Sequence, residues 1–137
     1  MTPLLVDSNI ILDLVTDDPD WSNWSAEQLE RHADQAVLVI NPLIYSEVSV
    51  GFAHIEDLEE ALSEDFFYRE ALPWEAAFLA GKAFLSYRRR HGTRRSPLPD
   101  FYIGAHAAVR GYRLLTRDRS RYETYFPSIE IIAPGTH

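Results

Sequence analysis

Four carboxylates, far apart in the sequence, lie next to segments that have the composition of buried strands. Asp7 ends the apolar run "LLVD", and Asp118 follows "RLLT" by two residues. Glu47 lies in a helical segment after "AVLVIN", and Asp100 lies in the first turn of the helical segment that precedes "RLLT". Sites in open parallel sheets form outside the carboxyl ends of the strands, so all four side chains could converge at one edge.

Such a convergence would have a chemical consequence. Carboxylates in one cleft repel one another, and some of them become protonated unless a cation compensates their charge. Hard divalent cations do this with oxygen ligands and water. The sequence has no cysteine and its five histidines are scattered, which argues against a zinc site. The four acidic residues together therefore indicate a site for a hard divalent cation.

Each acidic residue also has an ordinary structural explanation. Asp7 could cap the helix that follows it, although Ser8 or Asn9 could do so instead and leave Asp7 free to face a cleft. Asp100 suits the start of a helix dipole, and Asp118 suits a turn. Glu47 could be an exposed helix position, but its neighbours in the sequence are mostly apolar, which is an unusual setting for an exposed carboxylate. Taken jointly, the four residues favour a shared site.

The elements that would position these residues alternate along the chain. Strands are expected at 3–7, 36–41, 113–116 and 129–132, and helices at 9–15, 22–34, 42–53, 54–65, 73–92 and 99–112. Residues 66–72 fit either a strand or a loop. The alternation predicts an α/β fold, with a parallel sheet covered by helices on both faces. No linker or repeat interrupts it, so we expect one domain spanning residues 1–137.

The composition bears on the cellular location of the protein. No apolar run approaches the roughly 18 residues that a membrane span needs, and the N-terminus lacks a charged region ahead of an apolar stretch. The lack of cysteine is compatible with a reducing compartment. We therefore expect a cytoplasmic protein with no membrane partner.

The net charge of -8 conceals a strong polarity along the chain. Residues 1–87 carry 17 acidic and 3 basic side chains, whereas residues 88–137 carry 4 acidic and 10 basic side chains. The second part could present a basic face to a polyanion, or simply a solvated charged surface. The candidate phosphate contacts are Arg88, Arg89, Arg90, Arg94 and Arg95. Further candidates are Arg113, Arg117, Arg119 and Arg121. The alternative for the first three is a favourable interaction with the dipole at a helix C-terminus.

Three sequence blocks carry a resemblance to a known family. The blocks "LLVDSNIILDL", "PLIYSEVSVGF" and "LPDFYIGAHAAVRGYRLLTRD" resemble the PIN-domain ribonucleases, and especially the VapC-type toxins of toxin–antitoxin pairs. The resemblance covers essentially the whole chain. The last block is the most specific, because it joins Asp100 after a proline, a helix of small residues, and Asp118 in "LLTRD". The resemblance implies a single Rossmann-like PIN domain with a parallel sheet of about five strands.

The same resemblance implies a function and its residues. The implied activity is Mg²⁺- or Mn²⁺-dependent hydrolysis of RNA phosphodiesters. The implied metal ligands and catalytic residues are Asp7, Glu47, Asp100 and Asp118. Thr116, in T-x-D spacing with Asp118, matches a position that often carries a hydroxyl in the family, so we expect it to support catalysis, and Ser8 similarly. Asp118 is the ligand that we expect to act through water.

Two other functions remain open at this point. One is a phosphatase that uses Asp7 as its nucleophile, although such enzymes usually carry a second acid two residues later, where this chain has Asn9. The other is a non-catalytic PIN-like interaction domain.

The expected partners are an RNA substrate and, from the resemblance, a cognate antitoxin and a second copy of the chain in a homodimer. Apolar residues of the first two helical segments could form an exposed groove for a partner helix, or could be ordinary core. These residues are Ile10, Ile11, Leu14, Trp21, Trp24 and Leu29.

Overall fold

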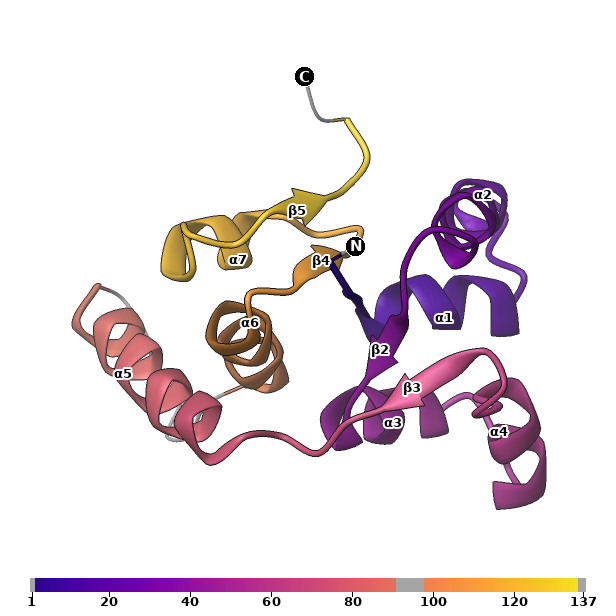
Figure 1. Cartoon of the computed structure of the whole chain (residues 1–137), viewed down its shortest axis with the longest axis horizontal. Helices are drawn as coiled ribbons and strands as arrows, with labels where there is room; N and C mark the ends of the chain where they lie inside the picture. The colour runs from indigo at the N-terminus through magenta and orange to yellow at the C-terminus, as the bar shows by residue number, and fades with distance from the viewer. Residues whose placement is uncertain (1, 91–97, 136–137) are drawn as a thin grey trace.

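The computed structural model describes residues 2–90 and 98–135. Its centre is one sheet of five parallel strands in the order β3-β2-β1-β4-β5 (Figure 1). The strands are β1 (Leu4–Val6), β2 (Leu38–Ile40), β3 (Phe67–Arg69), β4 (Arg113–Leu115) and β5 (Ile131–Ile132). The predicted parallel sheet of about five strands is confirmed, and the ambiguous segment 66–72 supplies the edge strand β3.

Helices cover both faces of this sheet, as predicted. In the described part of the chain they are α1 (Ser8–Val15), α2 (Ser22–Ala33), α3 (Pro42–Ser49), α4 (Ile55–Ala61), α5 (Trp74–Arg90), α6 (Pro99–Arg110) and α7 (Ser120–Tyr125). Figure 1 shows α1 and α2 on one side of the sheet and α5 and α6 on the other. Helix α3 packs against both α1 and α6. Within residues 2–90 and 98–135, no helix is long and apolar enough to cross a membrane.

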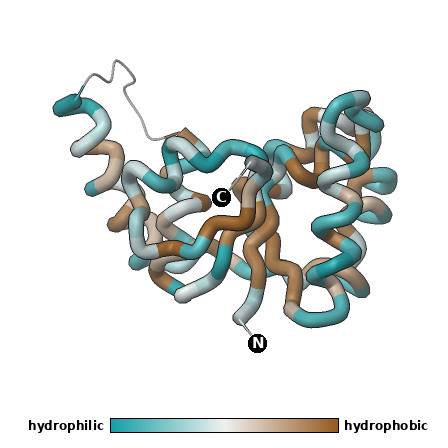
Figure 2. The backbone as a smooth tube through the Cα atoms, turned by 90° about the horizontal axis from the view of Figure 1, so that it is seen from above, coloured by the Kyte–Doolittle hydropathy of each residue, from teal (hydrophilic) through white to brown (hydrophobic). Residues whose placement is uncertain are grey.

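The central strands are apolar at successive positions because both of their faces are covered. Leu4, Leu5 and Val6 of β1 are completely buried, and Leu114 and Leu115 of β4 are equally inaccessible. Strands buried on both sides have this continuous apolar pattern rather than an alternating one. Figure 2 shows the hydrophobic colour concentrated in the strands at the centre of the molecule.

Local capping residues fix where the helices around the site begin. Asn41 accepts a hydrogen bond from the backbone N of Ile44 at 3.0 Å, and Pro42 occupies the first turn of α3. Helix α3 ends at Ser49, before the predicted end at residue 53, since the glycine at 51 disfavours helix. The predicted last turn of the helix 73–92 lies partly outside the described residues.

The strand order changes direction at β1. From β1 the chain moves outward to β2 and β3, and it then returns to the other side of β1 to form β4 and β5. Residues that follow β1 and β4 therefore lie at the switch point of the sheet, where ligands of open α/β proteins bind. Asp7 follows β1 and Thr116 follows β4. The fold thus brings together residues 109 positions apart in the sequence.

Candidate active site

Asp7 has two structural roles at once. It is the N-cap of α1, and its Oδ1 accepts a hydrogen bond from the backbone N of Ser8 at 2.7 Å. The expectation that Ser8 or Asn9 would cap this helix and leave Asp7 free is therefore wrong. A carboxylate has two oxygens, so Asp7 caps the helix with one and turns the other toward the site. The residue is 3% exposed.

Three donors from three parts of the chain surround Oδ2 of Asp7. Thr116 Oγ1 lies at 2.8 Å, Tyr122 OH at 2.9 Å and Asn9 Nδ2 at 3.5 Å. Asn9 accepts from the backbone N of Arg117 through its own Oδ1, so its amide nitrogen is free to donate toward Thr116 and Asp7. Thr116 and Tyr122 are both buried. These contacts fix the orientation of the Asp7 carboxylate.

Glu47 reaches the same region from α3. Its Oε1 accepts a hydrogen bond from Ser8 Oγ at 2.8 Å, and the side chain is partly buried. The Ser8 hydroxyl also lies 3.5 Å from Asp7 Oδ1. One hydroxyl therefore lies between the two carboxylates, in keeping with the supporting role expected of Ser8.

Asp100 approaches from the first turn of α6. Its Oδ1 lies 3.4 Å from Tyr122 OH, and its Oδ2 lies 3.3 Å from Nη1 of Arg121. Tyr122 is therefore shared by Asp7 and Asp100, and the shorter distance assigns its single hydroxyl proton to Asp7. The structure brings Asp7, Glu47 and Asp100 together at the carboxyl edge of the sheet.

Asp118 lies at the periphery of this cluster. Its side chain is exposed, and Oδ1 accepts from the backbone N and the hydroxyl of Ser120 at 3.2 and 3.1 Å. Its backbone N donates to Thr116 Oγ1 at 3.1 Å. Its negative charge still raises the pKa of Asp100. Thus Asp118 is near enough to influence the cluster, while its oxygens serve the turn before α7.

The clustered acids hold their protons more tightly than isolated carboxyls do. Burial raises the pKa of Asp7, against hydrogen bonds from Thr116 and Tyr122, and the charge of Asp100 raises it further. Burial likewise raises the pKa of Glu47, whose neighbouring carboxylates add to the effect. Burial raises the pKa of Asp100 despite the opposing charge of Arg121. A nearby positive charge would stabilise the ionised form of all three carboxyls and lower their pKa values.

Comparison with known proteins places this site in a family. A model of the PIN domain matches residues 4–127. The chain belongs to the PIN-domain family. The resemblance seen in the sequence is thereby confirmed at the level of the domain. A search of curated proteins found no match.

Solved structures show the same fold at low sequence identity. VapBC2 from Rickettsia felis, bound to a DNA fragment of its promoter, aligns with a TM-score of 0.73 and 16% identity over 95% of this chain and 97% of that one. VapBC from Salmonella typhimurium, bound to DNA, aligns with a TM-score of 0.69 and 20% sequence identity over 97% of this chain and 98% of that one. A toxin–antitoxin complex from Klebsiella pneumoniae aligns with a TM-score of 0.67 and 20% sequence identity over 98% of this chain and 99% of that one. The PIN domain here has no large insertion relative to these chains.

The donor set of this PIN domain suits a hard divalent cation. The oxygens of Asp7, Glu47 and Asp100 are hard ligands, and their mutual repulsion is what such an ion relieves. Within the described ranges, however, no three acidic or histidine side chains are already spaced to hold a metal ion. Asp7 is fixed by its hydrogen bonds, so ion binding would require movement of Glu47 and Asp100 toward it.

The predicted arginines separate into two groups. Arg88, Arg89 and Arg90 form the exposed last turn of α5, where the guanidinium of Arg88 stacks over Phe84 and that of Arg90 over Tyr125. The other two expected phosphate contacts, at positions 94 and 95, lie outside the described residues.

Sequence reasoning missed several residues that complete the site. Tyr122 carried no signal, because a tyrosine in a short polar segment is usually a surface or packing residue. Asp13, at the far end of α1, is buried and pairs with Arg117 Nε at 2.8 Å and Ser25 Oγ at 2.6 Å. This ion pair anchors the loop between β4 and α7 to α1.

A polar cluster around Glu70 and the buried His106 lies apart from the site. Glu70 accepts from Tyr112 OH at 2.6 Å and Arg110 Nε at 2.8 Å, and it lies 3.2 Å from Nε2 of His106. Asn41 Oδ1 already accepts from a backbone N, so its amide donates to Nδ1 of His106 and leaves the proton on Nε2, facing Glu70. His106 is completely buried and lies in this hydrogen-bonded cluster.

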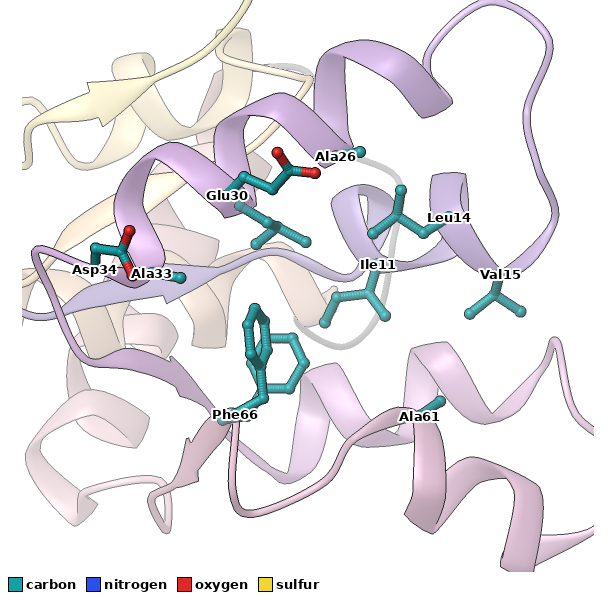
Figure 3. A pocket seen from close by; sticks show the side chains of 11 residues that line it. Ile11, Leu14, Val15, Ala26, Glu30, Ala33, Asp34, Ala61 and Phe66 are labelled. Carbon is teal, nitrogen blue, oxygen red and sulfur yellow. The ribbon is translucent and has the colours of Figure 1, made fainter.

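An apolar groove of about 740 Å³ lies between α1, α2 and the segment from α4 to β3. Figure 3 shows Ile11 and Leu14 of α1 and Phe66 directed toward this space. Of the six residues expected to line a groove, only Ile11, Leu14 and Leu29 do so. Ile10 is fully buried in the core, and Trp21 and Trp24 instead pack edge to face with ring centroids 6.1 Å apart.

Proposed function

We propose that this protein is a metal-dependent endoribonuclease that acts in the cytoplasm as the toxin of a type II toxin–antitoxin pair. The observation that carries the proposal is the convergence of Asp7, Glu47 and Asp100, with raised pKa values, at the switch point of a PIN-domain sheet. The fold similarity to VapBC structures supports the assignment to this class.

The residues of the chain have distinct parts in the proposed reaction. Asp7, Glu47 and Asp100 hold Mg²⁺ or Mn²⁺, and Asp118 contributes from the edge through water. When bound, the ion supplies Lewis-acid chemistry: it makes the attacking water more acidic and neutralises charge that builds up on the phosphate. Thr116 holds Oδ2 of Asp7 at 2.8 Å and so keeps that oxygen aimed into the site.

The geometry favours this function over the two alternatives. A phospho-aspartate mechanism usually needs a second acid two residues after the nucleophile. Here that position is Asn9, whose amide group contacts the backbone N of Arg117 and Oγ1 of Thr116. A purely interacting domain would have no use for one buried and two partly buried acids of raised pKa, which cost folding free energy.

The test is RNA cleavage by purified protein with Mg²⁺ or Mn²⁺. Asp7→Asn and Asp100→Asn should each lower the rate about 100-fold or more, since loss of even an indirect metal contact costs 10–100-fold. Asp57→Asn, an equal change on the exposed face of α4, should retain full activity. If the site variants cleave RNA as fast as the wild type, the proposed site is wrong.

We propose that the apolar groove between α1, α2 and β3 receives a helix of the cognate antitoxin. The groove is open, and its walls come from residues three and four apart on α1, a spacing that suits an amphipathic helix. Glu30 and Asp34 line one side and favour a basic residue on that helix. Leu14→Asp should weaken capture of the antitoxin encoded beside the toxin gene without altering RNA cleavage.

We also propose that the protein forms a homodimer. Trp74 and Phe78, one turn apart on α5, are 89% and 68% exposed, which is costly for a monomer and supports a self-contact there. Phe78→Glu should convert a dimer into a monomer in light scattering. A wild type that is monomeric at micromolar concentration would refute this part of the proposal.

A further inference from the structure

A polar depression of about 370 Å³ adjoins the candidate active site. It lies between the end of α5 and α7, and its cations are Arg90 from α5 and Arg121 from α7. Asp118 lines it as well, and Arg121 contacts Asp100 at 3.3 Å. The depression, called here the Arg90–Arg121 pocket, therefore borders the acidic cluster through Asp118 and Arg121.

Aromatic rings hold both guanidinium groups in place. The guanidinium carbon of Arg121 lies over the rings of Tyr87 and Phe101, 5.8 and 5.6 Å from their centroids, and that of Arg90 lies over Tyr125 at 5.6 Å. A guanidinium is planar and carries five N–H donors in a fixed fork, which is suited to bidentate recognition of phosphate.

Arg90 differs from most other arginines of the described chain, and Arg121 keeps donors that its ion pair does not use. Arg31, Arg69, Arg110, Arg117 and Arg119 each form an ion pair of 3.3 Å or less with an acidic side chain. Over residues 2–90 and 98–135, Arg90 has no acidic partner within 4.0 Å. Over the same residues, Arg121 has one ion pair, with Asp100, which uses one of its five N–H donors.

We propose that the Arg90–Arg121 pocket binds a backbone phosphate of single-stranded RNA, one position away from the bond cleaved beside Asp7, Glu47 and Asp100. This inference rests on the proposed ribonuclease function. It answers a difficulty of that function, because an acidic site repels the polyanion that it must cleave. Arg121 connects the two regions: on RNA binding it exchanges part of its interaction with Asp100 for the phosphate.

The test measures RNA binding rather than cleavage. A short fluorescein-labelled single-stranded RNA is titrated with full-length protein in EDTA over a series of KCl concentrations, and binding is followed by anisotropy. Arg90→Gln and Arg121→Gln should each weaken binding about 5–10-fold and lower the slope of log K against log salt by about 0.7, the value for one lost contact to a single strand. A DNA strand of the same sequence should show the same dependence on both arginines.

The controls separate a phosphate contact from a loss of folding. Arg31→Gln removes an equal charge from an exposed pair on α2 and should leave both affinity and slope unchanged. Arg90 is exposed and its replacement should not alter the melting temperature, so it decides the result even if Arg121→Gln unfolds α7. Unchanged affinity and slope in Arg90→Gln would overturn the inference.

Failure of the proposed function gives a different result. If Asp7→Asn cleaves RNA normally, or the wild type never cleaves, the ribonuclease site is wrong, while arginine-dependent binding would still support the phosphate pocket. If the wild type binds neither RNA nor DNA, the phosphate pocket is wrong as well.

Discussion

Replacement of Asp7 by Asn should stabilise the metal-free protein while it abolishes cleavage. Both Asp7 and Asp100 have an oxygen within 3.4 Å of the Tyr122 hydroxyl, so these oxygens are at most about 6 Å apart. Two unit charges at about 6 Å interact by roughly 3 kcal/mol at an effective dielectric constant near 20. Asparagine removes this repulsion and preserves the cap, because its carbonyl can accept from Ser8 while its amide can donate to the Tyr122 hydroxyl.

The expected gain in the free energy of unfolding is about 1–3 kcal/mol, or roughly 3–10 °C in melting temperature. The folded-state pKa of Asp7 lies above its ordinary value, so the wild type loses stability as pH rises through that folded pKa. The advantage of Asp7→Asn should therefore grow as pH rises through that folded pKa and vanish below the ordinary pKa of an aspartate. Thermal unfolding in EDTA at neutral and acidic pH measures both effects.

A matched control is available on the same helix. Asp13 is 2% exposed, as deeply buried as Asp7, but it faces Arg117 and Ser25 instead of other acids. Asp13→Asn should destabilise the protein by about 1–3 kcal/mol, because it breaks a buried charge-assisted contact. If Asp7→Asn is instead destabilising to the same degree at neutral pH, Asp7 is only a helix cap and the repulsive cluster does not exist.

Three further predictions concern the metal, the hydrogen-bonded carboxylate of Glu70 and the packing of α6. Mg²⁺ or Mn²⁺ at about 100 times its dissociation constant should stabilise the wild type by roughly 2.7 kcal/mol in thermal unfolding; equal stabilisation of Asp100→Asn would refute the site. Glu70→Gln should cost about 1–3 kcal/mol in urea unfolding, since hydrogen bonds from Tyr112 and His106 outweigh burial and lower the pKa of Glu70. That cost should be present at neutral pH and disappear as pH falls through this lowered pKa, and a cost independent of pH would contradict it. Gly104→Ala should lower the free energy of unfolding by about 1–3 kcal/mol, and with it the melting temperature, because the added Cβ would overlap the ring of Phe126. An unchanged melting temperature would mean that the ring moves freely.

The fold was predictable because its signals are local and repeated. Each central strand is a short apolar run, and the starts of α3 and α6 are marked by a proline at the first turn. Apolar strands that alternate with helices leave few arrangements other than a parallel sheet. The exact helix ends and the strand β3 were less accessible, since the segment around Phe67 has neither clear alternation nor a continuous apolar pattern.

The acidic members of the candidate site were predictable for a different reason. Carboxylates after apolar strands are conspicuous, and the topology of a parallel sheet gathers strand ends at one edge. Tyr122 was not accessible in this way, and Arg121 was expected only as a further phosphate contact, not as a partner of Asp100. Their contacts depend on how α7 packs against α6, and no local pattern in the sequence encodes that packing. Polar groups that complete a site through tertiary contacts are generally the part that sequence reasoning misses.

The position of Asp7 makes its role as helix cap compatible with its proposed role as a metal ligand. A cap needs one acceptor oxygen beside the first backbone N–H groups of a helix, and a metal site needs an oxygen at the end of a strand. A sheet that passes from β1 directly into α1 puts both requirements at the same residue. The hydrogen bond from Ser8 fixes Oδ1 and thereby aims Oδ2 toward Thr116 and Tyr122. The cap is thus the reason that the carboxylate is rigid, and rigidity at the switch point is what the proposed chemistry requires.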